Sequence, residues 1–298
     1  MPKSPEWIYH RHAHFYDLIQ LTEHTWSVVI GRAFAHTRIL IHMLPGKKAV
    51  LCDSAAFYCP QLFSWLEEQG VSVRAVICTH MHWDHVSNNY EVHDRYRGQI
   101  FASSTEWNTA LTGMRPTEYP ITFFEDNADI DIDGAIFHTR ILPGHSAGHH
   151  AIITPDGICY LGDAIMSLGP LQEAKLPYME DIELSVKSME EIAEMDYPLF
   201  VCSHNAVIRP DELPALVEAN IQAELELYRK IREFIREPGD LEEYVVSFMK
   251  SLGVSAETYT DEVWKHTARR RILELVHAGE LILDGSVVKP LSLSSYFI

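Results

Sequence analysis

The sequence predicts an α/β protein in which two β-sheets are layered between helices, an αββα sandwich, with a small helical domain after it. Short runs of β-branched and apolar residues, typical of strands, occur in two sets before residue 210. Segments with apolar residues at helical spacing separate these strands. From Asp211 the pattern becomes long, charged and helical, which divides the chain into residues 1–210 and residues 211–298.

The first part of the chain reads as strands followed by a helix and a further strand. Leu44–Lys47 contains Pro-Gly and separates two strands as a hairpin turn would. A helix is expected from Pro60 to Gly70, because proline favours the first turn of a helix and glycine its end. The expected strands lie at 28–30, 38–42, 49–53 and 73–78.

The same alternation continues to residue 210. Asp133-Gly134 and Asp156-Gly157 are typical of hairpin turns. Further strands are expected at 99–102, 121–124, 130–142, 150–154, 158–161 and 199–202, and helices near 88–97, 105–113 and 180–195.

The C-terminal part reads as helices over 211–237, 240–252 and 260–279. Asp284-Gly285 then predicts a β-hairpin. Three helices closed by a hairpin are the outline of a winged helix, and a helical extension packed on the main domain is the alternative. Its role is expected to be a wall of the active-site cleft or a contact between copies of the chain in a homo-oligomer.

Composition narrows the function classes. The net charge is −18, which repels phosphate backbones and argues against a nucleic-acid binder. No apolar run reaches the roughly 20 residues of a membrane span, and the first residues lack the apolar core of a signal peptide, so a cytoplasmic location is expected. The five cysteines show no CxxC spacing, which predicts buried, reduced thiols.

The strongest chemical signal is Thr79-His80-Met81-His82-Trp83-Asp84-His85, at the end of an apolar strand. Alternating side chains of an extended segment point the same way, so His80, His82 and Asp84 can converge on one side. His85 can reach a second position as the chain turns into a helix. Packing four ionisable groups together without a metal would be costly, which predicts bound cations.

This stretch matches the HxHxDH motif, and residues 15–210 resemble the metallo-β-lactamase superfamily. Later segments resemble the remaining motifs of that family in the same order. They are Pro143–His149 for a third histidine, Leu161–Ala164 for a bridging aspartate and Val201–Asn205 for a final histidine. Leu51–Ala55 resembles the family's Asp-Thr-Gly turn in a divergent form.

The resemblance implies a site for two divalent metal ions, zinc being expected and manganese or iron being alternatives. Its first ion would be bound by His80, His82 and His145. Its second would be bound by Asp84, His85 and His204, with Asp163 bridging the two. The ions would activate a water molecule as nucleophile, and Asp84 could also orient that water or shuttle its proton.

Other residues have two readings. His149 follows His145 by one helical turn and either holds a ligand through its ring N–H or packs in the core. Asn88 and Asn89 replace the small Gly-Gly turn that commonly follows HxHxDH, and either cap the next helix or face the substrate. Trp83 is expected to pack, with the edge of the pocket as the alternative. His10, His12 and His14 alternate without a completing ligand, which favours surface or sheet packing.

The sequence therefore predicts a metal-dependent hydrolase of a small ester, thioester or lactone. One alternative on the same fold is a mononuclear iron thiol or persulfide dioxygenase, which would not need Asp84, His85 and His204 as a second set. Another is an endoribonuclease or phosphodiesterase. Residues from Asp211 on carry roughly 16 acidic and 10 basic residues, and Arg269-Arg270-Arg271, their only basic cluster, reads as a solvated helix face, which disfavours RNA.

Overall fold

The computed structural model describes residues 14–32, 35–204 and 206–291. Within them, seven strands form the first sheet in the order β1-β2-β3-β4-β5-β6-β7. Strands β1 to β4 pair antiparallel, whereas β4 to β7 pair parallel. Their bounds are β1 His14–Gln20, β2 Thr25–Arg32, β3 Ala35–Leu44, β4 Lys48–Cys52, β5 Ser72–Ile77, β6 Gln99–Ser103 and β7 Ile121–Phe124.

The second sheet has the order β13-β12-β11-β10-β9-β8 in the described part of the chain. Its pairs are antiparallel except for β11 with β12. The bounds are β8 Asp129–Ile132, β9 Ala135–Ile141, β10 His150–Ile153, β11 Ile158–Gly162, β12 Leu199–Cys202 and β13 Ala206–Ile208.

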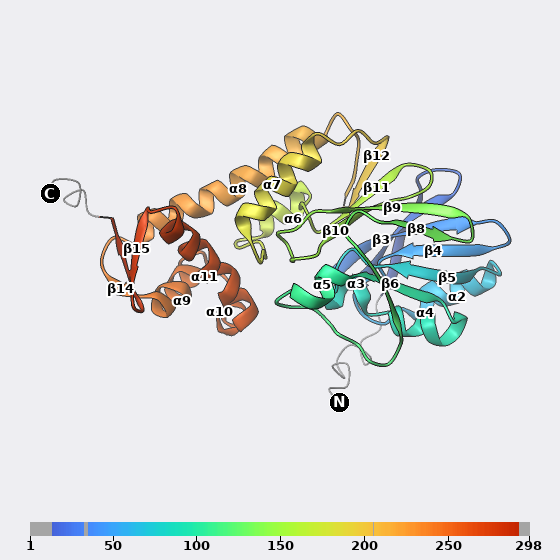
Figure 1. The fold of residues 1–298 in the computed structure, drawn as a ribbon, viewed down its shortest axis with the longest axis horizontal. Helices are drawn as coiled ribbons and strands as arrows, with labels where there is room; N and C mark the ends of the chain where they lie inside the picture. The colour runs from blue at the N-terminus through green and yellow to red at the C-terminus, as the bar shows by residue number, and fades with distance from the viewer. Residues whose placement is uncertain (1–13, 33–34, 205, 292–298) are drawn as a thin grey trace.

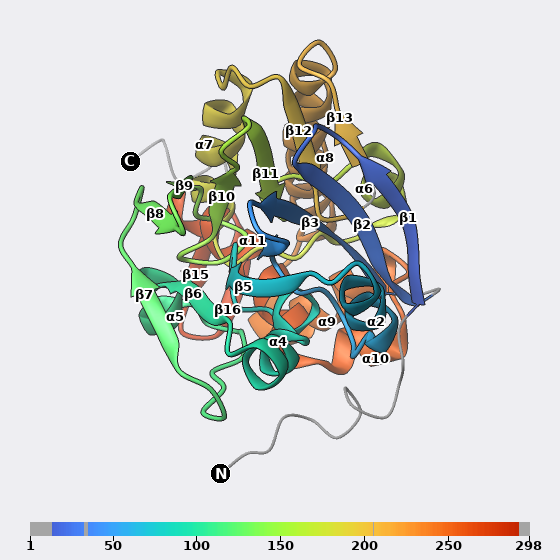
Figure 2. The same ribbon diagram turned by 90° about the vertical axis from the view of Figure 1, so that its right-hand side faces the viewer.

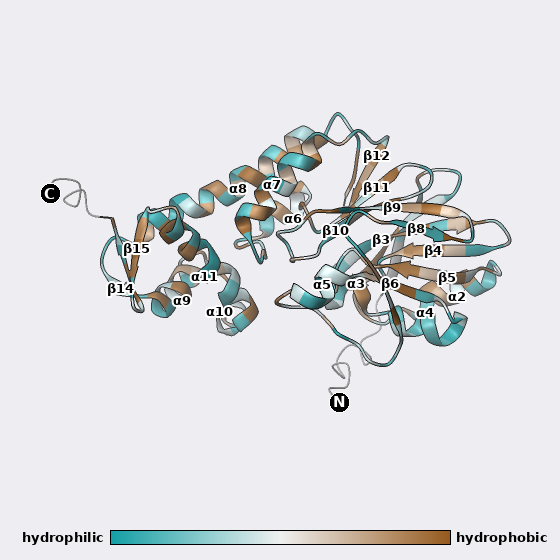
Figure 3. Cartoon of the chain, viewed as in Figure 1, coloured by the Kyte–Doolittle hydropathy of each residue, from teal (hydrophilic) through white to brown (hydrophobic). Residues whose placement is uncertain are grey.

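Helices cover the outer faces of both sheets, as Figures 1 and 2 show. One apolar cluster joins the first sheet to α2 and α4, and another joins the second sheet to α7 and α8. A third cluster lies between the sheets, where Leu40 and Val50 meet Phe137 and Tyr160. Strands that are apolar on both faces, seen in Figure 3, therefore produce the layered αββα sandwich. The helices up to residue 234 are α2 Pro60–Glu68, α3 Trp83–Val86, α4 Asn89–Tyr96, α5 Ser104–Thr109, α6 Leu168–Glu173, α7 Ile182–Ala193 and α8 Leu213–Phe234.

The C-terminal elements lie beyond the sandwich, at the far end of α8 (Figure 1). They have their own apolar cluster, which includes Ile231, Phe248 and Ile272. The ion pair of buried Arg271 with buried Glu224 joins the last helix to α8, at 2.8 Å. The elements are β14 Gly239–Asp240, α9 Leu241–Ser251, α10 Ala256–Thr260, α11 Glu262–His277, β15 Leu281–Asp284 and β16 Val287–Pro290, with the three strands in one sheet of order β14-β16-β15.

The expected strands and longer helices lie close to their predicted positions, and the αββα prediction is confirmed. The short elements α3, α6, α10 and β13 were not expected, because each has too few residues to show a helical or strand periodicity. All five cysteines are free and buried, as expected. None of the described helices is long and apolar enough to span a membrane. His10, His12 and the side chain of His14 lie outside the described residues.

Candidate metal centre

Four segments bring the predicted ligands to one edge of the sandwich. The first segment follows β5 and continues into α3, and it carries His80, His82, Asp84 and His85. The other three are the loop before β10, the end of β11 and the end of β12, which carry the remaining ligand candidates His145, Asp163 and His204. Because parallel strands end at the same edge of a sheet, side chains far apart in sequence meet there.

The first group consists of His80, His82 and His145. Nε2 of His80 lies 2.9 Å from Nδ1 of His82, and Nε2 of His145 lies 3.0 Å from that same Nδ1. Burial lowers the pKa of His82 to about 4 and the pKa of His80 and His145 well below the ordinary value. All three rings are therefore neutral near pH 7, which is the state that binds a metal.

The second group consists of Asp84, His85, Asp163 and His204. Oδ2 of Asp163 lies 3.2 Å from Nε2 of His85 and 3.3 Å from Nε2 of His204. The same oxygen lies 3.5 Å from Nε2 of His145, so Asp163 faces both groups. Burial acts to raise the pKa of Asp163, but His204 and His85 outweigh it and hold that pKa well below the usual range.

The donor atoms fit bound cations. Atoms held about 2.1 Å from a tetrahedral zinc ion lie roughly 3.4 Å apart, close to the separations in both groups. Nδ1 of His80 lies 3.0 Å from Oγ1 of Thr79, whose hydroxyl donates to Asp53. Nε2 of His82 lies 2.7 Å from Oγ1 of Thr112, whose hydroxyl donates to Glu180. Both rings thus carry their protons on the outer nitrogens, and their inner lone pairs face each other, an arrangement that a cation stabilises.

The second group has equivalent outer contacts. Nδ1 of His85 lies 2.7 Å from Oδ2 of the fully buried Asp53. Nδ1 of His204 donates to the carbonyl oxygen of His36 at 2.9 Å. Each contact leaves Nε2 of the ring directed at the group, as in metal sites whose histidines are oriented by carboxylates and carbonyls. Asp163 also has a buried Oδ1 with no hydrogen-bond partner among the described residues, which is a free position for an ion.

Two buried glutamates connect the loops that carry the candidate ligands. Glu106 accepts hydrogen bonds from the backbone of Met81 at 3.1 Å and Gly148 at 3.0 Å, and from the hydroxyl of Ser146 at 2.8 Å. It therefore ties the segment of His80 and His82 to the loop of His145. A Cβ atom at Gly148 would lie 2.1 Å from the backbone nitrogen of Glu106, so only glycine fits there. Glu180 accepts from the backbone of Thr112 and Ala147 at 3.0 and 3.2 Å.

A cavity of about 600 Å³ opens onto both groups. His82, Asp84, His145, Asp163 and His204 line its floor. Residues of the segment 174–179, together with Asp261 and two residues of α11, line its walls, so the C-terminal region is part of the cavity.

Two contacts fix that wall segment to α11. Arg271 donates to the carbonyl oxygen of Pro177 at 3.0 Å. Thr267 exchanges hydrogen bonds of 2.9 and 2.7 Å with the backbone of Met179. The C-terminal region therefore holds the wall in place as well as forming part of it.

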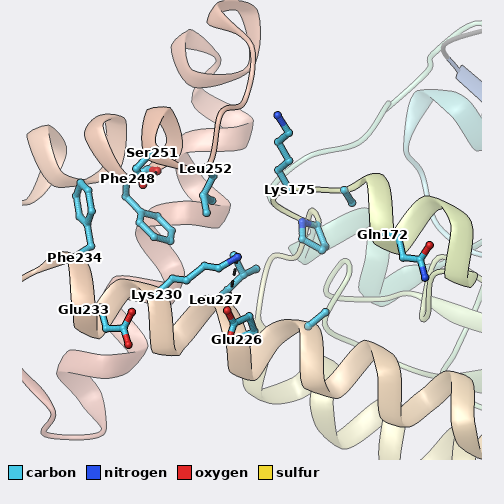
Figure 4. A pocket seen from close by; sticks show the side chains of 13 residues that line it. Gln172, Lys175, Glu226, Leu227, Lys230, Glu233, Phe234, Phe248, Ser251 and Leu252 are labelled. Carbon is cyan, nitrogen blue, oxygen red and sulfur yellow. Dashed lines mark hydrogen bonds and ion pairs between the residues drawn. The ribbon is translucent and has the colours of Figure 1, made fainter.

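A second cavity, of about 590 Å³, lies on the other side of the segment 174–177, between that segment, α8 and α9. Figure 4 shows Phe234, Phe248 and Leu227 around it, with Lys230 paired to Glu226 at 3.8 Å. None of its lining residues belongs to the predicted metal site. Five of the seven predicted ligand residues line the first cavity, and His80 and His85 lie behind them in the two donor groups.

The structure decides between several readings of the sequence. His149 is buried and its Nε2 accepts a 3.0 Å hydrogen bond from the backbone N–H of Asp163, so it positions the segment of that aspartate. The helical spacing inferred for His145 and His149 was wrong, because residues 142–149 form a loop in which Gly144 has φ 135°. Trp83 both packs on Phe57, with ring centres 5.1 Å apart, and lines the cavity.

The asparagines and arginines also differ from expectation. Asn88 occupies the N-cap position of α4, but its buried side chain holds the loop of residues 54–59 through Ser54, Phe57 and Cys59, so it makes no capping hydrogen bond and does not line the cavity. The basic cluster is a solvated helix face only in part, because Arg271 is buried and all three arginines are paired with carboxylates. Arg269 pairs with Glu242 at 2.5 Å, Arg270 with Asp181 at 2.5 Å and buried Arg271 with Glu224 at 2.8 Å.

Glu106, Thr112, Glu180 and Trp264 are functional candidates that the sequence did not indicate. No motif surrounds them, and their contacts exist only once the loops meet. The sequence indicates Asp53 only as part of a divergent turn; in the structure its φ is 60° and its carboxylate contacts His85.

Comparison with known proteins identifies relatives of this arrangement. The profile of the Metallo-beta-lactamase superfamily matches residues 32–204, more than half of the 298 residues. A Caenorhabditis elegans protein named "Beta-lactamase-like protein 2 homolog" is 22% identical over 255 residues, which cover 82% of this chain and 78% of that protein. A "Hydroxyacylglutathione hydrolase" of Ruegeria pomeroyi is 28% identical over 131 residues, 44% of this chain and 48% of that protein.

A "Probable polyketide biosynthesis zinc-dependent hydrolase BaeB" of Bacillus velezensis is 25% identical over 123 residues, 41% of this chain and 52% of that protein. The chain thus spans about half the length of the Ruegeria and Bacillus proteins. Among solved structures, a metallo-beta-lactamase family protein from Thermus thermophilus has a TM-score of 0.72 at 14% identity, covering 91% of this chain and 100% of that one. A beta-lactamase domain protein from Burkholderia ambifaria has a TM-score of 0.68 at 17% identity, covering 92% and 94%. These structures share the fold.

Proposed function

The chain belongs to the metallo-beta-lactamase superfamily, and we propose that this hydrolase uses two divalent metal ions, zinc by preference, to cleave a small carboxylic ester, thioester or lactone. The names of the Ruegeria and Bacillus relatives support hydrolysis and, for the Bacillus protein, zinc. The observation that carries the proposal is the pair of adjacent donor groups that share Asp163.

Bound ions would supply Lewis acidity, which lowers the pKa of water and polarises a substrate carbonyl. The protein supplies the geometry. The carboxylate of Asp84 lines the cavity, where it can orient a water molecule by accepting a hydrogen bond from one of its O–H groups. Hydrolysis then joins the water oxygen to the acyl carbon, breaks the bond to the leaving sulfur or oxygen and delivers one proton to that leaving atom. Asp84 is the residue that we propose for this proton transfer.

The two alternatives are less well supported. A mononuclear dioxygenase would leave Asp84, His85 and His204 without a role, although their donor atoms lie within 4.8 Å of one another together with Asp163. A nuclease needs cations for phosphates, yet Arg269, Arg270 and Arg271 are all paired with carboxylates. For the C-terminal region we keep residues 211–298 as a proposed winged-helix-like domain, and the cytoplasmic location stays a prediction.

Metal titration of the metal-free protein tests the proposal. We expect two ions per chain, with thioester or ester hydrolysis that rises as the second ion binds. His145→Asn and His204→Asn should each lower the number of tightly bound ions to one and lower the rate at least about 100-fold, since each removes a ligand. His138→Asn is the matched control, because His138 is exposed and outside the site. One ion per chain at saturation, or full activity of either ligand variant, contradicts the proposal.

A further inference from the structure

The walls of the active-site cavity are apolar. Beyond the candidate ligands, most lining residues are apolar or aromatic, and three of them are methionines. A volume of about 600 Å³ lies within the range of roughly 300–1,000 Å³ that small-molecule sites occupy.

The cavity also lacks a partner for an anion. Among the described residues that line it, none is lysine or arginine. Outside the candidate metal groups, the charged residue among the described residues that line it is Asp261, which is negative. A substrate carboxylate or phosphate placed against these walls would lose water without gaining a cation, which is unfavourable. The net charge of −18 also repels an anionic substrate as it approaches the protein.

An aromatic pair from two parts of the chain narrows the space above the first group. The ring of Tyr178 lies 5.3 Å from that of His82 and 5.4 Å from that of His145. The indole of Trp264 lies 5.9 Å from Tyr178 in an edge-to-face arrangement. A chain that extends along this wall from a carbonyl at the metal groups would pack against Tyr178 and Trp264.

Resting on the proposed hydrolysis, we infer that the substrate carries an uncharged, apolar acyl group, which packs against Tyr178, Val263 and Trp264. The enzyme thus selects against acyl groups and leaving groups that end in a carboxylate. Burying one methylene stabilises a complex by about 0.8 kcal/mol, which is about fourfold in affinity. Burying a carboxylate without a partner raises the free energy of binding by more than burial of the methylenes lowers it. We therefore expect about 100-fold discrimination against such substrates.

A matched pair of substrates tests this inference. Hexanoyl and adipoyl thioesters of N-acetylcysteamine have the same chain length and differ in a terminal methyl or carboxylate. We expect kcat/KM of the metal-loaded full chain to be about 100-fold higher for the hexanoyl thioester. From acetyl through butanoyl to hexanoyl, kcat/KM should rise about fourfold for each methylene that contacts the wall.

Binding provides a measurement that does not depend on turnover. S-hexyl-N-acetylcysteamine and its S-(5-carboxypentyl) counterpart cannot be hydrolysed, and calorimetry gives their dissociation constants. The hexyl compound should bind about 100-fold more tightly. Absence of turnover with this preference intact would overturn the proposed function and leave standing the selection of the cavity for uncharged, apolar chains. Turnover with equal binding and equal kcat/KM for both members of each pair would overturn the inference alone.

A single cation placed in the wall should change the preference. Val263 is 39% exposed and lines the cavity, so Val263→Lys adds a positive charge without disturbing the core. We expect the hexanoyl-to-adipoyl ratio to fall at least about tenfold, because the ammonium gives the carboxylate a partner. Val287→Lys is the control, since Val287 is 38% exposed and lies outside the cavity. An unchanged ratio in Val263→Lys, or an equal fall in Val287→Lys, contradicts the role of this wall.

Discussion

Replacing Asp53 by asparagine should weaken the second metal group while preserving the shape of the residue. Oδ2 of Asp53 accepts hydrogen bonds from Nδ1 of His85 at 2.7 Å, Tyr160 at 3.0 Å and the Thr79 hydroxyl at 2.9 Å, while Oδ1 accepts from the Thr79 backbone at 2.7 Å. If the asparagine oxygen keeps the Thr79 backbone contact, its NH₂ group faces His85. Nδ1 of His85 must then accept, which moves the ring proton to Nε2.

That proton would occupy the lone pair directed at Asp163, 3.2 Å away, where an ion would bind. Loss of a group that orients a metal-binding histidine typically weakens metal affinity 10- to 100-fold, or about 1.4–2.7 kcal/mol. We therefore expect Asp53→Asn to bind the first ion with near wild-type affinity and the second about 10- to 100-fold more weakly. Competition with a chromophoric chelator, combined with metal analysis, measures both affinities.

The control is Asp129→Asn, which changes a carboxylate that contacts Nδ1 of exposed His138 at 2.6 Å on the surface. It should leave both affinities unchanged. If Asp53→Asn binds both ions with affinities within twofold of wild type, the Asp53 contact does not determine which ring nitrogen of His85 is protonated. That result would refute this reasoning.

Three further outcomes are expected. Asp163→Ala should lose more metal and more activity than substitution of any one histidine ligand, because Asp163 faces both groups; metal content and rate near wild type would remove it from the site. Gly148→Ala should lower the free energy of unfolding by at least about 2 kcal/mol in urea titration, since its Cβ would meet Glu106 at 2.1 Å, whereas Gly169→Ala, with no atom within 4 Å, should be close to neutral. Burial lowers the pKa of His42, so the native protein takes up fewer protons than the unfolded chain below about pH 6.5, and stability is lost as the pH falls. His42→Gln should make that loss shallower by up to about 1.4 kcal/mol per pH unit between pH 7 and 5, while His138→Gln, at the surface, should keep the wild-type slope.

The layers of the fold could be predicted because each strand and long helix carries its own pattern. Ala75 to Ile77 and Leu199 to Cys202 are apolar runs, and both lie in largely buried strands. The one-turn helix α3 and the helix α6 are too short for periodicity to distinguish them from loops. The domain boundary near Pro210 and the winged-helix-like character of the C-terminal region stay predictions.

Part of the candidate site could also be predicted from the sequence, and part could not. Residues 80–85 form a dense local motif, and resemblance supplied His145, Asp163 and His204, which the structure brings beside it. Their roles as ligands stay predictions. Glu106 could not be found from sequence, because a lone glutamate gives no sign that three donors from two distant loops will converge on it. Trp264 reaches the cavity only because α11 packs against the segment 174–179.

The origin of the cavity in two parts of the chain bears on how such enzymes diversify. The candidate ligands come from residues 80–204, whereas Val263 and Trp264 come from a region that contributes none of them. Substitutions in this region can therefore alter which molecules enter the cavity without changing any candidate ligand. Homologues with identical catalytic motifs can be expected to have diverged in the molecules that they accept. Transferring a substrate from one homologue to another requires comparing residues 261–264 as well as the histidines.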